Sequence, residues 1–159
     1  MADDTASAPT VLEGADAIRA AVGKHLGYSD WVLITQERVN QFADATGDHQ
    51  WIHVDVERAK KESPYGGTIA HGYLTMSMSN ELVPRVVRMG GFAMGINYGV
   101  DKVRFPAPVK VGERVRAGVE IAEVTDVPGG IQVKMRIAVE VEGSEKPACV
   151  IESLARWME

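Results

Sequence analysis

The sequence predicts an α+β fold in which a curved antiparallel sheet wraps around one central helix. Two observations lead to this prediction. Residues 70–88 are apolar on most sides of a helical projection, which is typical of a helix buried over most of its surface. After this segment, hydrophobic residues recur at every second position, as expected for long strands with one buried face. A sheet folded around the helix buries both surfaces at once.

The composition indicates one globular domain. A chain of 159 residues can bury one core but is marginal for two, and its 45% hydrophobic and 25% charged residues are ordinary for a soluble protein. We expect residues 1–10 to be a loose tail and residues 11–159 to be the domain. The net charge of −5 argues against nucleic acid as a partner, because phosphate binding needs a basic excess.

Neither a membrane span nor a secretion signal is visible. No stretch of about 18 apolar residues exists, and residues 1–10 lack the basic start and apolar run of a signal peptide. The single cysteine, Cys149, cannot form an internal disulfide, and its place in an expected strand makes it a small core residue. We therefore expect a cytoplasmic protein that is not bound to a membrane.

The first expected element is a short amphipathic helix at 15–26. Ile18, Val22 and Leu26 have the spacing of one helical face, and Gly27 is placed to end the helix. A brief strand should follow at residues 31–34.

A second helix is expected at residues 36–46. Thr35 is a good N-cap, and Gly47 is placed where a left-handed residue ends a helix. Beyond Gly47 the pattern has no clean period until about residue 68, apart from a short solvated helix at 55–61. An irregular segment of this length is uncommon in a compact domain unless it is functional.

The strands after the central helix are expected to be antiparallel. The apolar positions change parity within the first of them, so we predict a bulge between Gly99 and Lys102 that restores one buried face. Val127–Gly130 has the composition of a hairpin turn. The expected strands cover residues 96–105, 114–121, 131–141 and 147–157.

Residues 41–74 hold most of the unusual chemistry. Three of the four histidines, His49, His53 and His71, lie there with Asp48. Five extended residues would separate Asp48 from His53 by roughly 16 Å. Five residues of a helix would rotate them about 140° apart. Only an irregular loop brings both side chains to one water molecule, so we interpret the segment as a site.

In this segment the chain resembles the MaoC-like dehydratases, which include the R-specific enoyl-CoA hydratases and share the hot-dog fold. The resemblance rests on the run from Phe42 to His53, FADATGDHQWIH, in which Gln50 and Trp51 replace the asparagine and proline usual in the family. It also rests on Ile69–Gly72 and on KVRFPAPV at residues 102–109. DHQWIH and TIAHG are similar in particular to the NodN-like subgroup.

The resemblance implies reversible hydration of a trans-2-enoyl thioester to an R-3-hydroxyacyl thioester, carried on coenzyme A or acyl carrier protein. Asp48 and His53 would activate the water in an overhang segment inserted beside the sheet. The Gly72 N–H, at the start of the central helix, would stabilise the charge that develops on the thioester oxygen. The resemblance also implies a homodimer. It implies no metal or redox cofactor.

Other readings of these residues stay open. Asp48 can be a cap and His53 a structural histidine, and His49, His53, Asp48 and His71 can be imagined as a metal site. We expect no metal and assign His71 to the substrate pocket.

Four residues of the strand after the central helix are weaker candidates for substrate binding. Asn97 and Tyr98 would line the acyl tunnel. Lys102 and Arg104 would meet the coenzyme A phosphates, although a solvated strand face also explains them. The rival functions are a thioesterase on the same fold and a non-catalytic thioester-binding subunit.

Overall fold

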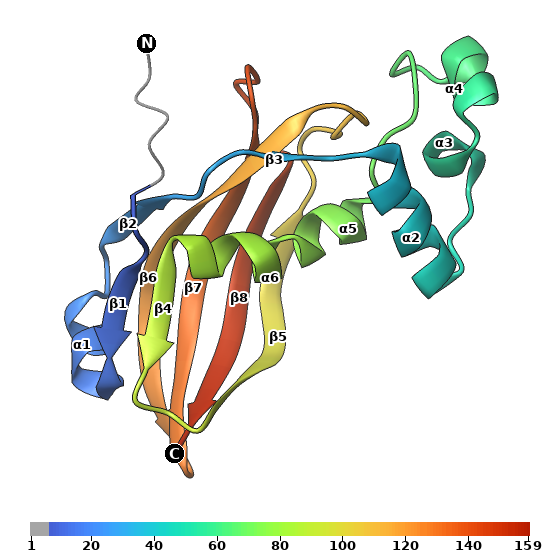
Figure 1. The fold of residues 1–159 in the computed structure, drawn as a ribbon. Helices are drawn as coiled ribbons and strands as arrows, with labels where there is room; N and C mark the ends of the chain where they lie inside the picture. The colour runs from blue at the N-terminus through green and yellow to red at the C-terminus, as the bar shows by residue number, and fades with distance from the viewer. Residues whose placement is uncertain (1–6) are drawn as a thin grey trace.

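A six-stranded antiparallel sheet curves around a helical segment in this computed structural model, which describes residues 7–159 (Figure 1). The long strands follow one another in the order β2-β6-β7-β8-β5, and β3 also pairs with β6. The predicted α+β fold is confirmed. The strands of this sheet are β2 (His25–Tyr28), β3 (Val32–Leu33), β5 (Met94–Arg104), β6 (Arg114–Val127), β7 (Gly130–Val141) and β8 (Cys149–Met158).

The sheet forms because its strands alternate between a buried and a wetter face. Alternate residues of β7 are buried from Ile131 to Val141, and they pack against the central helix. The hairpin predicted at Val127–Gly130 is confirmed, because these two residues pair across a two-residue turn. Cys149 is fully buried at the start of β8, and burial raises the pKa of its thiol to about 11.

The central helical segment is shorter than predicted. It consists of α5 (Gly72–Ser77), α6 (Ser79–Leu82) and the 3₁₀ turn η1 (Val83–Arg85), and does not reach residue 88. Pro84, which has no N–H to donate, lies in the closing turn. Leu74 and Leu82 are buried against the sheet, whereas Tyr73 and Asn80 are exposed. The segment exposes one stripe, at Tyr73, Ser77, Asn80 and Pro84, and its other sides are buried or half-buried, as expected.

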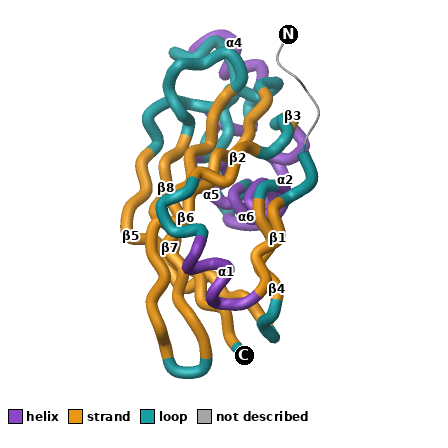
Figure 2. The backbone as a smooth tube through the Cα atoms, turned by 90° about the vertical axis from the view of Figure 1, so that its left-hand side faces the viewer, coloured by secondary structure: helices purple, strands orange, loops and turns teal. Residues whose placement is uncertain are grey.

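Two short parallel strands were not predicted. β1 (Thr10–Glu13) pairs with β4 (Val87–Gly90), and Figure 2 shows them side by side next to α1 (Gly14–Ala20). Residues 87–88, assigned to the helix from their pattern, lie in β4. Of the tail expected at residues 1–10, residues 1–6 lie outside the described part, and Thr10 already belongs to β1.

The N-terminal helix also ends earlier than predicted. α1 stops at Ala20, and Gly23 follows with a φ of 81°. The Gly23 N–H donates to the Ile121 carbonyl at 2.8 Å, which directs the chain into β2. Leu26 therefore packs against the core from a strand and not from a helix.

An overhang beyond the N-terminal end of α5 carries α2 (Gln36–Thr46), α3 (Trp51–Val54) and α4 (Val56–Glu62) (Figure 1). The predicted bounds of α2 are confirmed. Thr35 Oγ1 accepts from the Arg38 N–H at 3.1 Å, and Gly47 has a left-handed φ of 81°.

β5 is an edge strand with two register shifts, between Asn97 and Gly99 and between Val100 and Lys102. The predicted bulge is confirmed, and the strand ends at Arg104 before Pro106. The expected burial of one face is not observed, since nearly every residue of β5 is exposed in this single chain.

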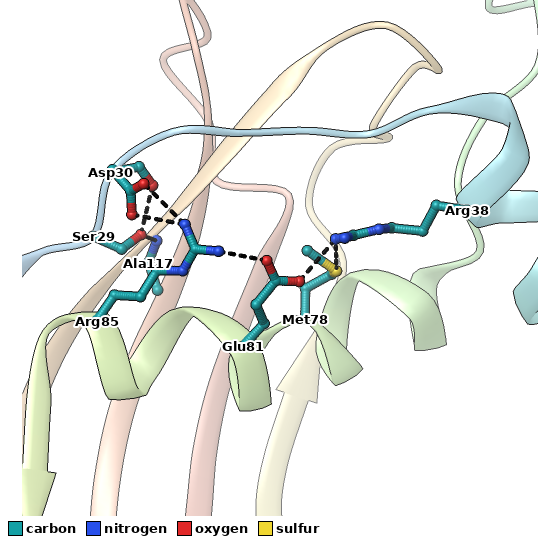
Figure 3. Close-up of polar contacts among 7 residues, drawn as sticks. All are labelled: Ser29, Asp30, Arg38, Met78, Glu81, Arg85 and Ala117. Atoms are coloured by element: carbon teal, nitrogen blue, oxygen red, sulfur yellow. Dashed lines mark hydrogen bonds and ion pairs between the residues drawn. The ribbon is translucent and has the colours of Figure 1, made fainter.

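An ion-pair network joins the central helix to its neighbours on two sides (Figure 3). Arg85 bonds both carboxylate oxygens of Asp30 and one oxygen of Glu81, at 2.7–3.0 Å. The other oxygen of Glu81 accepts from Arg38 on α2 at 2.9 Å. The overhang is thus tied to the central helix. No helix in residues 7–159 has the length and apolar character needed to cross a bilayer.

Candidate active site

Asp48 lies just past the left-handed turn that ends α2. Its side chain is exposed, and Oδ1 accepts from the Gln50 N–H at 3.3 Å. Residues 48–50 are irregular, as the spacing of Asp48 and His53 predicted. The loop does not extend to His53, however, because that residue lies on α3, a helix that was not predicted. Proline is favoured at a first helical position. Here Trp51 occupies that position. The centroid of its ring lies 4.4 Å from the guanidinium carbon of Arg58.

His53 is buried on α3 and has a defined hydrogen-bonding state. Its Nδ1 lies 2.8 Å from the Ile69 carbonyl oxygen. Because a carbonyl oxygen can only accept, Nδ1 carries the hydrogen and Nε2 of the neutral ring keeps a lone pair. Burial, and secondarily His71, lowers the pKa of His53, although the Ile69 contact and Asp48 oppose this shift. The ring is therefore held neutral as a proton acceptor.

The side chain of Gln36 links α2 to α3 and to the chain segment before α5. Its Nε2 donates to the His53 carbonyl at 2.7 Å, and its Oε1 accepts from the Thr68 hydroxyl at 2.6 Å. These contacts were not predicted, because Gln36 is 17 residues from His53 and 32 from Thr68. No local pattern signals such a bridge.

His71 completes the site from the residue before α5. Its Nε2 donates to the Asp48 carbonyl at 2.9 Å, and its ring stacks on His53 with centroids 3.8 Å apart. Its Nδ1 is buried and has no hydrogen-bond partner among residues 7–159. Phe42 contacts the same ring, with centroids 4.9 Å apart. His71 is thus part of the cluster that contains His53.

Gly72 is the first residue of α5, so its N–H has no acceptor within the helix. A Cβ at Gly72 would lie 3.2 Å from three atoms of the Phe105 ring. The missing side chain therefore keeps the backbone accessible at this position.

These predicted residues lie on one cavity of about 460 Å³. Each of Asp48, His53 and His71 offers one possible ligand atom, and the three atoms lie within 4.8 Å of one another. These three residues could therefore hold a metal ion. The structure thus brings Asp48 and His53 together. The aromatic part of the wall was not foreseen. The cavity is lined by Phe42, Thr46, Asp48, His53, His71, Gly72, Tyr73 and Phe105.

The four weaker candidates lie elsewhere in the described chain. The Asn97 side chain donates to the Asn80 side-chain oxygen at 3.0 Å. The centroid of the Tyr98 ring lies 3.5 Å from the guanidinium carbon of Arg156. Arg104 donates to the carbonyl of Val103. None of these residues lines the cavity of Asp48 and His53 in the single chain.

Lys102 lines a separate pocket, together with Glu120, Arg136 and Glu152. His49 turns toward Asp44, with Nε2 and Oδ1 3.0 Å apart, and that contact raises its pKa. His49 is accordingly not part of the three-residue cluster.

A curved sheet around a helix, with a carboxylate and a neutral imidazole on one cavity, defines a hot-dog protein whose site can exchange protons. The model of the MaoC like domain family matches residues 17–143, and the chain belongs to this family.

Related proteins agree with this assignment. The 3-hydroxyacyl-thioester dehydratase Z of Mycobacterium tuberculosis is 53% identical over 148 residues, covering 92% of this chain and 97% of the relative. Nodulation protein N of Rhizobium leguminosarum bv. viciae is 42% identical over 146 residues, covering 89% and 86%. The solved R-hydratase PhaJ1 from Pseudomonas aeruginosa has a TM-score of 0.69 and 25% identity, covering 87% and 82%.

Proposed function

We propose that this protein hydrates trans-2-enoyl thioesters to R-3-hydroxyacyl thioesters and catalyses the reverse dehydration. The observation that carries the proposal is that Asp48, the His53 ring and Gly72 line one cavity. The 53% identity to a protein named as a 3-hydroxyacyl-thioester dehydratase supports the same reaction class. The substrate is an acyl thioester, carried on coenzyme A or acyl carrier protein.

In the proposed reaction, Asp48 and His53 Nε2 accept hydrogen bonds from one water molecule. One of them takes a proton as the water oxygen bonds to carbon 3. The electrons of the double bond move to the thioester, whose oxygen is stabilised by the Gly72 N–H. The enolate then takes a proton at carbon 2 from the same pair. Because the pair holds water on one side of the substrate, a single stereoisomer forms.

This chemistry uses side chains and backbone alone, so we propose that no metal or redox cofactor takes part. Coenzyme A enters only as part of the substrate. We also propose a cytoplasmic location, since the chain's single cysteine, Cys149, is buried and has no partner for an internal disulfide.

We further propose a homodimer formed through the edge strand β5. This strand pairs with β8 on one side only, and an exposed apolar edge favours pairing with another chain. Ile96→Asp is expected to give monomers by light scattering, whereas Val11→Asp, on β1, should leave the dimer intact. A monomeric wild-type protein would contradict the proposal. The exposed apolar residues of β5 are Met94 (56%), Ile96 (45%), Tyr98 (55%) and Val100 (49%).

Hydration of crotonyl-CoA, followed by loss of enoyl absorbance, tests the function. Asp48→Asn and His53→Gln should each lower kcat/KM about 10²–10⁴-fold, the usual contribution of a positioned acid or base. The glutamine amide of the His53→Gln variant can still donate to the Ile69 carbonyl, so this variant should stay folded by circular dichroism. His49→Gln is the matched control and should retain activity.

The two rival functions predict different results in the same assay. Release of free thiol without a change in enoyl absorbance would indicate a thioesterase. Substrate binding with neither reaction would indicate a non-catalytic subunit.

A further inference from the structure

The cluster of Asp48, His53 and His71 has an unmet need for a ligand. His53 donates its Nδ1 hydrogen to Ile69, and His71 donates its Nε2 hydrogen to the Asp48 carbonyl. The remaining ring nitrogens, His53 Nε2 and His71 Nδ1, are both acceptors in the neutral rings. His71 is only 3% exposed, and its Nδ1 has no hydrogen-bond partner in the described part of the chain. A buried acceptor without a partner destabilises the fold unless something binds it.

A water molecule can only partly meet this need. It has two hydrogens, whereas the cluster offers two ring nitrogens and a carboxylate. A cation can accept electron pairs from all three groups at once. Its charge is also favoured here, because no lysine or arginine is among the residues that line the cavity.

We propose that Asp48, His53 and His71 bind a divalent transition-metal ion such as Zn²⁺. Two imidazoles and one carboxylate are a common ligand set for such ions. Both rings already donate their other N–H to a backbone carbonyl, an arrangement that orients metal-binding histidines. One possible ligand atom from each of the three residues, a ring nitrogen or a carboxylate oxygen, lies within 4.8 Å of the other two. Ligands of a tetrahedral zinc ion are roughly 3.3 Å apart, so the site must contract on binding. Exposed Asp48 can supply that movement. The two rings, stacked at 25°, must also turn apart so that both lone pairs meet the ion.

The bound ion would occupy the place of the reacting water and engage both groups that hold it. Zn²⁺ is therefore an inhibitor that displaces the reacting water, and not a cofactor. The inhibition rests on the proposed function, whereas the binding does not.

Titration of the untagged protein with ZnCl₂ by calorimetry tests the binding. One Zn²⁺ per chain is expected. His71→Gln, which can keep the donor to the Asp48 carbonyl, should weaken binding by at least about tenfold. Asp48→Asn, at an exposed position, should do the same and covers the case in which His71→Gln fails to fold. His49→Gln should bind as wild type does.

Co²⁺ should give visible absorption bands in the wild-type protein and lose them in the two cluster variants. In the hydration assay, Zn²⁺ should lower the apparent kcat even at saturating crotonyl-CoA. Absence of stoichiometric binding, or binding that is lost in His49→Gln but kept in His71→Gln and Asp48→Asn, would overturn the proposal. A protein that binds Zn²⁺ at the cluster without hydrating crotonyl-CoA would refute only the proposed function.

Discussion

The rings of His53 and His71 stack with an interplanar angle of 25°, and each ring donates to the backbone of a different segment. His53 bonds the Ile69 carbonyl and His71 bonds the Asp48 carbonyl. The overhang and the chain before α5 therefore hold each other in place through the two rings. Two imidazolium ions at this separation would repel each other, so the stack favours a neutral His53.

The pH dependence of activity should reflect this neutral ring. Because the pKa of His53 is below its ordinary value of about 6.5, the lone pair on Nε2 persists into mildly acidic solution. We expect kcat/KM to remain high below pH 6.5 and to fall only as His53 becomes protonated. A midpoint of the acid limb above about 6.5 would contradict this assignment.

The same shift predicts a pH dependence of stability. The folded state binds a proton at His53 more weakly than the unfolded state does. His53 therefore contributes stability above about pH 6.5 that is lost as the pH falls through the folded-state pKa. Urea unfolding of wild type and His53→Gln between about pH 7 and pH 5 measures this contribution. The difference between the two unfolding free energies should shrink on acidification.

Gly72→Ala should impair the cavity without removing the backbone N–H. The added methyl would lie 3.2 Å from the Phe105 ring, so the ring or the helix start must move. We expect kcat/KM to fall about tenfold, less than the loss of an oxyanion donor. Phe105→Leu should restore part of the activity in the double variant. Gly67→Ala is the control, because a Cβ there meets nothing within 4 Å.

Gly47→Ala should destabilise the protein through backbone strain alone. Gly47 has a φ of 81°, and a Cβ at this position would meet no atom within 4 Å. The expected cost is about 1 kcal/mol in the free energy of unfolding. Gly47→Asn should cost less, since asparagine tolerates this conformation better. Equal stability of the alanine variant and wild type would argue against the left-handed turn before Asp48.

Arg85→Met should show how far the ion-pair network stabilises the central helix. Arg85 bonds both Asp30 and Glu81. Each of the three side chains is more than a third exposed. Solvent screening keeps the expected loss near 1 kcal/mol. The isolated pair of Lys60 and Glu57 is much more exposed, so Lys60→Met should change the unfolding free energy by less than about 0.5 kcal/mol. Chemical denaturation of both variants provides the comparison.

Local signals predicted α2 and the hairpin correctly because their determinants are adjacent in sequence. Thr35 and Gly47 directly flank α2, and the turn after Val127 joins strands that pair beside it. The pairing of β1 with β4 could not be predicted in this way, since the partners Thr10 and Val87 are 77 positions apart in the sequence. Apolar residues on β5 suggested burial, yet within one chain nothing covers them among the described residues.

The active site also combines features that local sequence predicts with features that it does not. The spacing of Asp48 and His53, with Gly47 before them, predicted an irregular loop that brings both side chains together. The Ile69 carbonyl that fixes the His53 tautomer, and the Gln36 bridge, come from tertiary contacts that leave no periodic pattern. The departure at Trp51 preserves the helix start, because a first helical position needs no internal N–H partner.

Cys149 gives the protein an internal reporter of opening. It is the only cysteine of the sequence, and it is fully buried at the start of β8. Its raised pKa keeps the thiol protonated at neutral pH. Disulfide-exchange reagents should therefore leave the native molecule unlabelled and modify it only when the strand separates from its neighbours. The rate of labelling would measure that separation without an engineered probe, and colorimetric detection of released coenzyme A would have no protein background.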